Sequence, residues 1–408
     1  MRVRDLQDKN IVIWGTGREG QAAADFLTGL TPVFVDETAT TKAGVITEPD
    51  EIEKTLEAAD VVIKSPGVSL YHPLVQKLKA KGTPVTSLLN LWLAEPHTAT
   101  SICVTGTKGK STTSALLAHV LKALGQRVAL AGNIGLPIST ITPSEFDIVV
   151  IETSSFQAAD LQETCDVAVL TSLYEDHIDW HGSREIYHGD KLNLLRHAKL
   201  RIVSRQASSV VSDLPDLIVA EADVSAVGNS YLSRPHNLEN VRTVLTIIRA
   251  LGFDEAQALS AMHDFTGLPH RQQELGEKGG ILYVNDSIST TAYSAIAALN
   301  TYTDRPVTLI AGGYDRGIDY KPLIERLSTS TVKAVILLGP SGKRLGELLK
   351  DRADLTLKPA SSMEEAVASA QELTAPGGVI LLSPGAPSFG LFRDFVQRGE
   401  KFIEVSGF

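Results

Sequence analysis

Residues 102–114 read Ile-Cys-Val-Thr-Gly-Thr-Lys-Gly-Lys-Ser-Thr-Thr-Ser, and this stretch decides how the rest of the chain is organised. The apolar run 102–104 predicts a buried strand, and the helical spacing of apolar residues in 114–124 predicts a helix beginning near Lys110. A strand, a glycine turn and a helix N-terminus surround an anion with backbone N–H groups. In such a loop Lys110 reaches the terminal phosphates of a nucleotide, and the Ser111 hydroxyl binds Mg²⁺.

The spacing of this loop departs from the common phosphate-binding pattern. Only Thr107 and Lys108 separate Gly106 from the Gly109-Lys110 pair, which is fewer residues than the usual loop has. A strand, a glycine and a helix also occur as plain structural turns in α/β proteins. The Gly-Lys-Ser-Thr run at the helix start favours nucleotide binding over that alternative.

Length and composition narrow the class of protein. The 408 residues, 43% apolar and 21% charged, suit two or three globular domains, and the net charge of −10 disfavours a nucleic-acid or membrane partner. The chain has no apolar run as long as a membrane span and no signal-peptide core, which predicts a cytoplasmic protein. Cys103 and Cys165 lie in apolar runs and are expected to be buried, reduced thiols.

The first hundred residues carry a second glycine signature. Residues 10–21 read as a strand followed by Gly-Thr-Gly-Arg-Glu-Gly and a helix over 22–30, and a second strand ends at Asp36. This pattern is the Rossmann fingerprint, in which the glycines admit a pyrophosphate and the acidic residue hydrogen-bonds a ribose or a base. On its own the pattern is weak evidence for NAD, because many nucleotide-diphosphate sugars can use the same crevice. Ser65-Pro66-Gly67 follows another strand, at the end where α/β proteins bind ligands.

Acidic residues follow two later strands of the central region. The apolar strand 147–152 ends in Glu152, and the strand 166–171 leads into Glu175-Asp176-His177. The ends of parallel strands share one edge of a sheet, so these groups are expected beside the P-loop, where a carboxylate can bind the Mg²⁺ of a nucleotide. A solvated strand-end carboxylate is the alternative for Glu152. Locally, Lys191 reads as a solvated helix lysine, and capping explains Asn237 as well as ligand binding does.

After residues 265–271 the strand and helix pattern restarts. Strands at 280–286, 307–313, 334–340 and 379–385 alternate with helices, and none is followed by a complete P-loop. The sequence therefore predicts an α/β protein of three domains: a Rossmann-like domain (1–95), a P-loop ATPase-like domain with a parallel sheet (96–267), and a second Rossmann-like domain (268–408).

Together these motifs resemble the Mur ligase family over nearly the whole chain. The resemblance rests on motifs in family order: Ser65-Pro-Gly, 105–112, 132–137, Glu152-Thr-Ser-Ser-Phe-Gln, Glu175-Asp-His, Lys191, His236-Asn237, 267–271, Asn285-Asp-Ser and 383–399. Folylpolyglutamate synthases share the P-loop domain but are not expected to carry the N-terminal Rossmann domain.

The resemblance implies an ATP-dependent amide ligase of peptidoglycan precursor synthesis that joins glutamate to UDP-N-acetylmuramoyl-L-alanine through an acyl phosphate, working as a monomer. The implied UDP-substrate contacts are Gly15, Thr16, Gly17, Arg18, Glu19, Asp36, Ser65, Gly67 and Asn133. The implied ATP contacts are Gly106, Thr107, Lys108, Gly109, Lys110, Ser111, Thr112, Asn237, Asn240, Arg271 and Asp286. Lys110, Glu152, His177 and Lys191 are the implied catalytic residues.

The resemblance also implies two Mg²⁺ ions. Ser111 and Glu152 match ligands of the first, and His177 and a carbamylated Lys191 match those of the second. Carbamylation has a physical sense, because CO₂ converts a cation that repels Mg²⁺ into an oxygen anion that binds it. Thr290, Arg316, Ser388 and Phe395 are the implied glutamate contacts.

The glutamate end departs from the usual pattern of enzymes that add D-glutamate. Ile288 stands where a lysine usually follows Asn-Asp-Ser, Arg316 replaces another common lysine, and 385–390 read Gly-Ala-Pro-Ser-Phe-Gly. These changes resemble a less common branch that adds L-glutamate, and D-glutamate remains the alternative substrate. Two more distant alternatives are an NAD-dependent oxidoreductase and a non-catalytic nucleotide-binding scaffold. The first leaves the P-loop unexplained, and intact Lys110 and Glu152 argue against the second.

Overall fold

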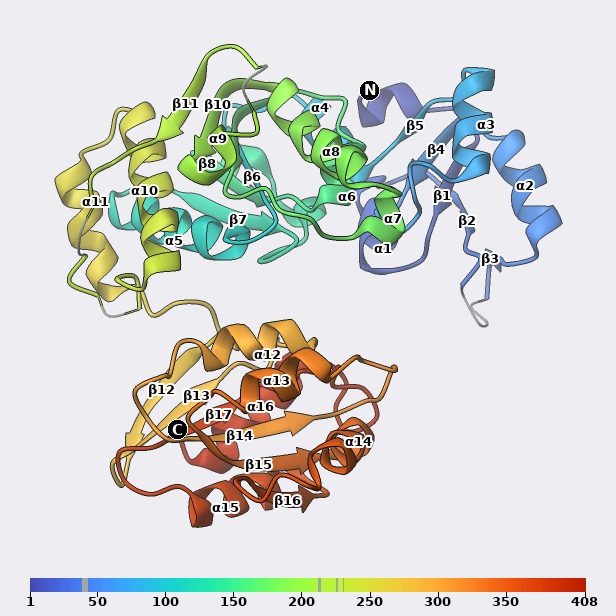
Figure 1. The fold of residues 1–408 in the computed structure, drawn as a ribbon. Coiled ribbons are helices and arrows are strands. Elements are labelled where there is room, and N and C mark those ends of the chain that lie inside the picture. Colours follow the sequence, from blue (N-terminus) through green and yellow to red (C-terminus); the bar gives the residue numbers. More distant parts are fainter. Residues whose placement is uncertain (39–42, 212–213, 225–226, 230) are drawn as a thin grey trace. The chain divides into compact units, whose positions relative to one another are not determined.

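The computed structural model describes residues 1–38, 43–211, 214–224, 227–229 and 231–408, and it divides into two compact units, Met1–Phe265 and Thr266–Phe408. The first unit contains two β-sheets and the second contains one, each flanked by helices (Figure 1). The predicted α/β class, with three sheets built from strand and helix alternation, is confirmed. Within the described residues, no helix is long and apolar enough to cross a membrane.

The N-terminal sheet is parallel and has the strand order β3-β2-β1-β4-β5. Its strands are β1 (Ile11–Trp14), β2 (Val33–Val35), β3 (Val45–Ile46), β4 (Val61–Lys64) and β5 (Val85–Thr86), and its helices are α1 (Arg18–Phe26), α2 (Pro49–Glu57), α3 (Pro73–Lys81) and α4 (Leu88–Ala94). Helix α1 begins at Arg18, four residues earlier than the apolar spacing predicted, because Gly17 already provides its N-cap. The strand order reverses between β1 and β4, which opens a ligand crevice at their carboxyl ends.

The central sheet is also parallel, with the order β11-β10-β9-β6-β8-β7. Its strands are β6 (Thr100–Thr105), β7 (Val128–Gly132), β8 (Ile148–Glu152), β9 (Cys165–Leu170), β10 (Ala198–Ser204) and β11 (Leu217–Ala220). Its helices are α5 (Lys110–Ala123), α6 (Ser155–Ala159), α7 (Ile178–His181), α8 (Arg184–Arg196), α9 (Arg205–Ser208), α10 (Pro235–Ala250) and α11 (Glu255–Ala261). Cys103 and Cys165 are buried and free, as predicted.

The central strands are apolar on both faces because helices cover both sides of the sheet. Ile102, Val104 and Val150 pack with α5 and α10 on one face, while Cys103 and Ile151 pack on the other. This double burial explains why the strands are continuous apolar runs rather than alternating ones. The ends of β6 and β8 lie side by side because these two strands are paired.

The C-terminal sheet has the order β12-β13-β17-β14-β15-β16. Its strands are β12 (Gln273–Lys278), β13 (Ile281–Asn285), β14 (Val307–Gly312), β15 (Val332–Leu338), β16 (Thr356–Ala360) and β17 (Val379–Leu382). Its helices are α12 (Ala292–Leu299), α13 (Lys321–Leu327), α14 (Gly339–Leu349), α15 (Met363–Leu373) and α16 (Phe395–Ser406). Only β12 runs antiparallel among the described strands, joined to β13 through Gly279 and Gly280, both at positive φ.

Candidate functional site

The P-loop lies at the carboxyl end of β6, as the sequence predicted. Gly109 has φ +85°, and a Cβ added there would lie 2.5 Å from the Asn240 side-chain oxygen, so the loop packs tightly against α10. The Lys110 ammonium donates to the backbone carbonyls of Gly106 (2.8 Å) and Thr107 (3.3 Å). The lysine therefore folds over the loop that surrounds the expected phosphate position, while Ser111 and Thr112 are buried in the first turn of α5.

A cavity of about 190 Å³ opens beside this loop. Thr107 and Lys110 line it together with His177 and Lys191, and the remaining lining residues are Glu19, Pro66, Asn133, Ser154, Ser155, Phe156, Asp176 and Tyr187. The structure thus brings three of the four predicted catalytic residues to one cavity. His177 is exposed, with φ +49°, and its ring packs edge-on against Phe156.

Lys191 is buried, whereas its local sequence suggested a solvated helix lysine. Its ammonium donates to the Gly106 carbonyl at 2.9 Å and lies over the Tyr187 ring. Burial and the nearby Lys110 charge lower the pKa of Lys191 well below its usual value, against the opposing effect of Asp176 and Glu152. The side chain reaches the P-loop because α8 packs on α6 and on the strands β6, β9 and β10. No local pattern in the sequence carries that information.

Glu152 ends β8 and is buried. Its Oε1 accepts a hydrogen bond from the Asn133 amide at 2.9 Å, while its Oε2 is buried without a hydrogen-bond partner among the described residues. An orphaned carboxylate oxygen at the end of β8, the strand paired with β6, fits a divalent cation, because Mg²⁺ takes few protein oxygens and retains water. Ser111 and Glu152 thus offer oxygen donors of the kind that Mg²⁺ prefers.

A larger cavity, of about 660 Å³, occupies the crevice at the carboxyl ends of β1 and β4. All nine residues predicted to contact a UDP substrate line it: Gly15, Thr16, Gly17, Arg18, Glu19, Asp36, Ser65, Gly67 and Asn133. The cavity also includes Leu88, Pro137 and Ile138, so residues of both sheets of the first unit contribute to its wall. Its volume is in the range of pockets that hold a nucleotide-sized ligand.

Asp36 has a structural task in this crevice. Its carboxylate accepts four hydrogen bonds, from the backbone N–H and hydroxyl of Thr16 and from those of Thr38. Burial alone would raise the pKa of Asp36, but these bonds outweigh it and lower the pKa to about 2. The ionised carboxylate thus shapes the glycine loop. A further bond from this residue to a ribose or base stays a prediction.

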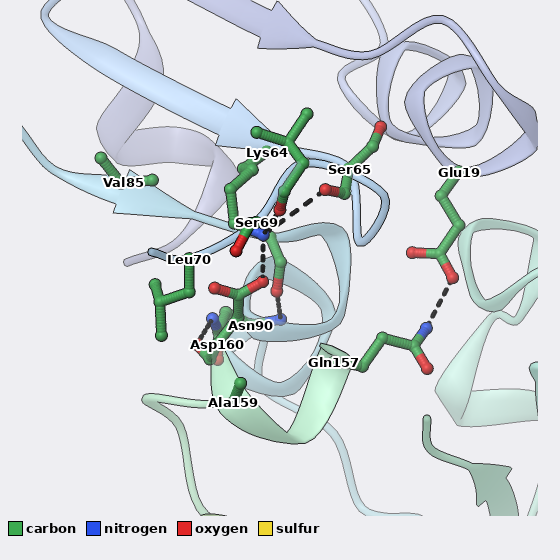
Figure 2. Close-up of polar contacts among 12 residues, drawn as sticks. Glu19, Lys64, Ser65, Ser69, Leu70, Val85, Asn90, Gln157, Ala159 and Asp160 are labelled. Atoms are coloured by element: carbon green, nitrogen blue, oxygen red, sulfur yellow. Dashed lines mark hydrogen bonds and ion pairs between the residues drawn. The ribbon is translucent and has the colours of Figure 1, made fainter. Parts of the chain in front are cut away.

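The two cavities share a wall. Glu19, Pro66 and Asn133 line both, so a ligand that fills the larger cavity can extend past them to Lys110. Glu19 accepts a hydrogen bond from the Gln157 amide at 2.5 Å, and this bond joins α1 to α6 (Figure 2). Burial raises the pKa of Glu19 to about 7, and the charges of Arg18 and Lys64 oppose that rise.

The other predicted nucleotide contacts fall in two places. Asn237 and Asn240 share a hydrogen bond of 3.1 Å on α10, and Asn237 also donates to the Tyr231 carbonyl. Asn237 does not cap this helix, because Arg234 occupies the N-cap and Asn237 lies in the first turn. Arg271 and Asp286 belong to the second unit, where Asp286 is buried and burial raises its pKa to about 6.

The predicted glutamate contacts follow three neighbouring parallel strands of the second unit. Thr290 follows β13, Arg316 follows β14 and Ser388 follows β17, and the order β13-β17-β14 puts these strand ends on one edge. The Arg316 guanidinium donates to the Thr290 carbonyl at 3.3 Å. Phe395 begins α16, and its carbonyl accepts from the Ser287 hydroxyl.

The sequence did not predict a buried network of hydrogen-bonded side chains beside the smaller cavity. The Ser155 hydroxyl lies 3.0 Å from His181 Nε2, and His181 Nδ1 lies 2.6 Å from the Asp190 carboxylate. The other oxygen of Asp190 accepts from the Tyr71 hydroxyl of the N-terminal sheet region. Tyr71 and Ser155 are far in sequence from His181 and Asp190, and no spacing rule connects the four residues.

Two family profiles match the chain. The Mur ligase middle domain matches residues 104–222, and the glutamate ligase domain of Mur ligases matches residues 270–385. The UDP-N-acetylmuramoyl-L-alanine–L-glutamate ligase of a Micromonospora species is 37% identical and aligns over 99% of this chain and 98% of its own. The enzyme of the same name from Xanthomonas axonopodis pv. citri is 36% identical, over 100% and 97% of the two chains.

Solved structures share the fold at lower identity. UDP-N-acetylmuramate-alanine ligase of Thermotoga maritima has a TM-score of 0.60 and 19% identity, covering 97% of this chain and 98% of its own. The folylpolyglutamate/dihydrofolate synthase of Yersinia pestis, solved with AMPPNP and a manganese ion, has a TM-score of 0.55 and 18% identity, covering 78% and 91%.

Proposed function

The chain belongs to the Mur ligase family, and from that premise we propose that it joins L-glutamate to UDP-N-acetylmuramoyl-L-alanine with hydrolysis of ATP to ADP and phosphate. Mur ligases are ATP-dependent amide ligases, so the reaction class follows from the family. The observation that carries the choice of substrate is the pair of cavities joined at Glu19, Pro66 and Asn133. The volume of the larger cavity supports binding of the UDP-sugar there, and the shared wall supports a path for its alanyl end toward Lys110.

The chemistry begins with a poor acyl donor. The alanyl carboxylate attacks the γ-phosphorus of ATP, ADP leaves, and an acyl phosphate forms. The glutamate amine then attacks the acyl carbon and inorganic phosphate leaves, while the amine loses a proton. The P-loop N–H groups and the Lys110 ammonium neutralise the charge that gathers in both steps.

Bound Mg²⁺ supplies further neutralisation of phosphate charge in such a site. Ser111 and Glu152 are the proposed ligands of one ion, and the orphaned Glu152 oxygen supports this. His177 and a carbamylated Lys191 are the proposed ligands of a second. Burial of Lys191 beside the Gly106 carbonyl supports the carbamate, because the amine is held at the P-loop rather than in solvent.

The preference for L-glutamate has two independent supports. The full-length relatives are named for L-glutamate, and Ile288 removes a positive charge from the loop after β13. We also propose that the enzyme works as a monomer in the cytoplasm, where ATP is available. The domain boundaries 1–95, 96–267 and 268–408 are kept as part of this proposal.

A phosphate-release assay tests the function. We expect release only when ATP, UDP-N-acetylmuramoyl-L-alanine and glutamate are all present, together with an amide product heavier by one glutamyl residue. ATP hydrolysis that does not depend on the UDP substrate contradicts the proposal and favours a different acceptor. Reduction of NAD by the enzyme supports the oxidoreductase, and nucleotide binding without turnover supports the scaffold.

A further inference from the structure

A lysine at the end of β4 is completely buried between the two sheets of the first unit. The Lys64 side chain has no exposed surface, and its ammonium lies 2.5 Å from Oδ2 of Asp160, which is also buried (Figure 2). Lys64 belongs to the N-terminal sheet, whereas Asp160 is the C-cap of α6 in the central region. The pair therefore crosses from one sheet region to the other.

The Lys64 ammonium also holds a loop of the larger cavity. Besides Asp160, it donates to the Val68 carbonyl at 2.7 Å and to the Ser65 carbonyl at 3.4 Å. Two of its hydrogen bonds therefore go to backbone carbonyls, and its charge is paired with the Asp160 carboxylate. The two carbonyls flank Pro66 and Gly67, which line the larger cavity. The Lys64 ammonium therefore holds both ends of this loop.

Asp160 is fixed in turn by its backbone. The Asn90 amide of α4 donates to the Asp160 carbonyl at 2.8 Å, and the Asn90 side-chain oxygen accepts from the N–H of Gln162. At the other end of the short helix α6, Ser155 and Phe156 line the smaller cavity. The ion pair thus connects a loop that lines the larger cavity to the helix α6, which lines the smaller cavity.

The pair is poorly suited to provide stability alone. Burial lowers the pKa of Lys64 and raises the pKa of Asp160, in each case against the attraction of the partner. Buried ion pairs often contribute no more than an apolar pair of similar volume, because desolvation offsets the Coulomb attraction. An apolar pair would not supply the two directed hydrogen bonds to the Ser65 and Val68 carbonyls or the ion pair with Asp160.

We propose that Lys64 and Asp160 are positioning residues that hold the Ser65-Pro66-Gly67 loop in register with α6, so that a substrate bound in the larger cavity presents its carboxylate to the P-loop. This inference rests on the proposed function. The pair touches no reacting atom, and it acts through Pro66 and Phe156. Loss of the charge lets the loop relax while the apolar core around it remains closed.

Kinetics of three variants test the proposal. Lys64→Met should reduce kcat/KM for UDP-N-acetylmuramoyl-L-alanine at least tenfold and leave the KM for ATP within twofold. In Lys64→Met/Asp160→Leu the buried charges are gone, so the melting temperature should return toward the wild-type value while kcat/KM stays low. The matched control is Lys77→Met, which removes a lysine from an exposed ion pair on α3 and should change none of these quantities.

Two results overturn the proposal: recovery of wild-type kcat/KM by the double variant, or a KM for ATP that rises in step with that for the UDP substrate. If the double variant does not fold, the test rests on Lys64→Met alone. Titration with ADP then gives the concentration of folded Lys64→Met, and the affinity of this variant for UDP-N-acetylmuramoyl-L-alanine is measured without ATP. An at least tenfold weaker affinity supports the positioning role, and an unchanged affinity refutes it. Absence of turnover in the wild-type enzyme contradicts the proposed function instead.

Discussion

Lys110 is the single residue whose removal should affect catalysis most. Its ammonium lies over the P-loop, held by the Gly106 and Thr107 carbonyls, where the transferring phosphoryl group is expected. We expect Lys110→Ala to lower kcat about a thousandfold or more, because an electrostatic stabiliser of the transition state is lost. Lys122→Ala, an exposed lysine on the same helix, is the control. Near-normal turnover of folded Lys110→Ala would mean that phosphate transfer occurs elsewhere.

Lys191 provides a prediction of a different kind, because its proposed working form is a carbamate. Lys191→Ala should be nearly inactive and should regain part of its turnover in acetate or formate, since a small carboxylate can replace the missing oxygen anion. The measurement is phosphate release against carboxylate concentration, with the same salts added to Lys110→Ala as a control that should not respond. Unaltered Mg²⁺ dependence in Lys191→Ala, or an unmodified lysine in the Mg²⁺-bound enzyme, contradicts the carbamate.

Among the elements, α1 carries the buried Glu19, which is hydrogen-bonded to Gln157 of α6 and whose contribution to stability should depend on pH. The pKa of Glu19 is raised from 4.5 to about 7, so the folded protein binds more protons than the unfolded chain between these values. The contribution of Glu19 to the free energy of unfolding therefore falls as pH rises from 4.5 to 7. Glu19→Gln keeps the shape and removes the charge. We compare the melting temperature of the variant with that of wild type at each pH. This difference should be more positive at pH 8 than at pH 5, by roughly 5 °C. An equal difference at both pH values contradicts this.

Strands and helices with local signals could be predicted from the sequence. The turn from β6 into α5 and the strand β8 ending in Glu152 agree with the apolar runs and glycines that predicted them. Strand β12 was missed because it is largely polar and exposed on the sheet edge, so it lacks an apolar run. The start of α1 was predicted late because its first turn is polar and packs on the crevice.

Nine residues that line the larger cavity were predicted, and eight of them follow β1, β2 or β4, which end on one edge of the N-terminal sheet, whereas Asn133 follows β7 of the central sheet. The burial of Lys191 and the Lys64–Asp160 pair could not be predicted. Both depend on how helices α6 and α8 pack between the two sheets, and residues so far apart in sequence carry no common spacing. The pattern of charges in a sequence indicates which faces are exposed. A lysine that is buried beside a distant partner cannot be told from a solvated lysine in the sequence.

At the scale of the whole molecule, the proposed contacts are divided between the two units. The acyl phosphate is expected at the P-loop of the first unit, while the proposed glutamate contacts lie on a strand edge of the second. The two enantiomers carry the same groups, so a site selects one of them only through the positions of its cationic partners.

Arg316 is the charged side chain proposed for that selection. Its planar guanidinium can bind a carboxylate through two hydrogen bonds, whereas the uncharged Ile288 offers none. Moving a carboxylate away from this partner leaves a charge unpaired, so kcat/KM for L-glutamate should exceed that for D-glutamate by about a hundredfold or more. Arg316→Ala should raise the KM for glutamate without changing that for ATP, and Arg352→Ala, on the exposed pair with Asp354, should change neither. Steady-state kinetics with each enantiomer make the comparison. A clear preference for D-glutamate would show that Arg316 takes over the role of the usual lysine, and would leave the ligase assignment intact.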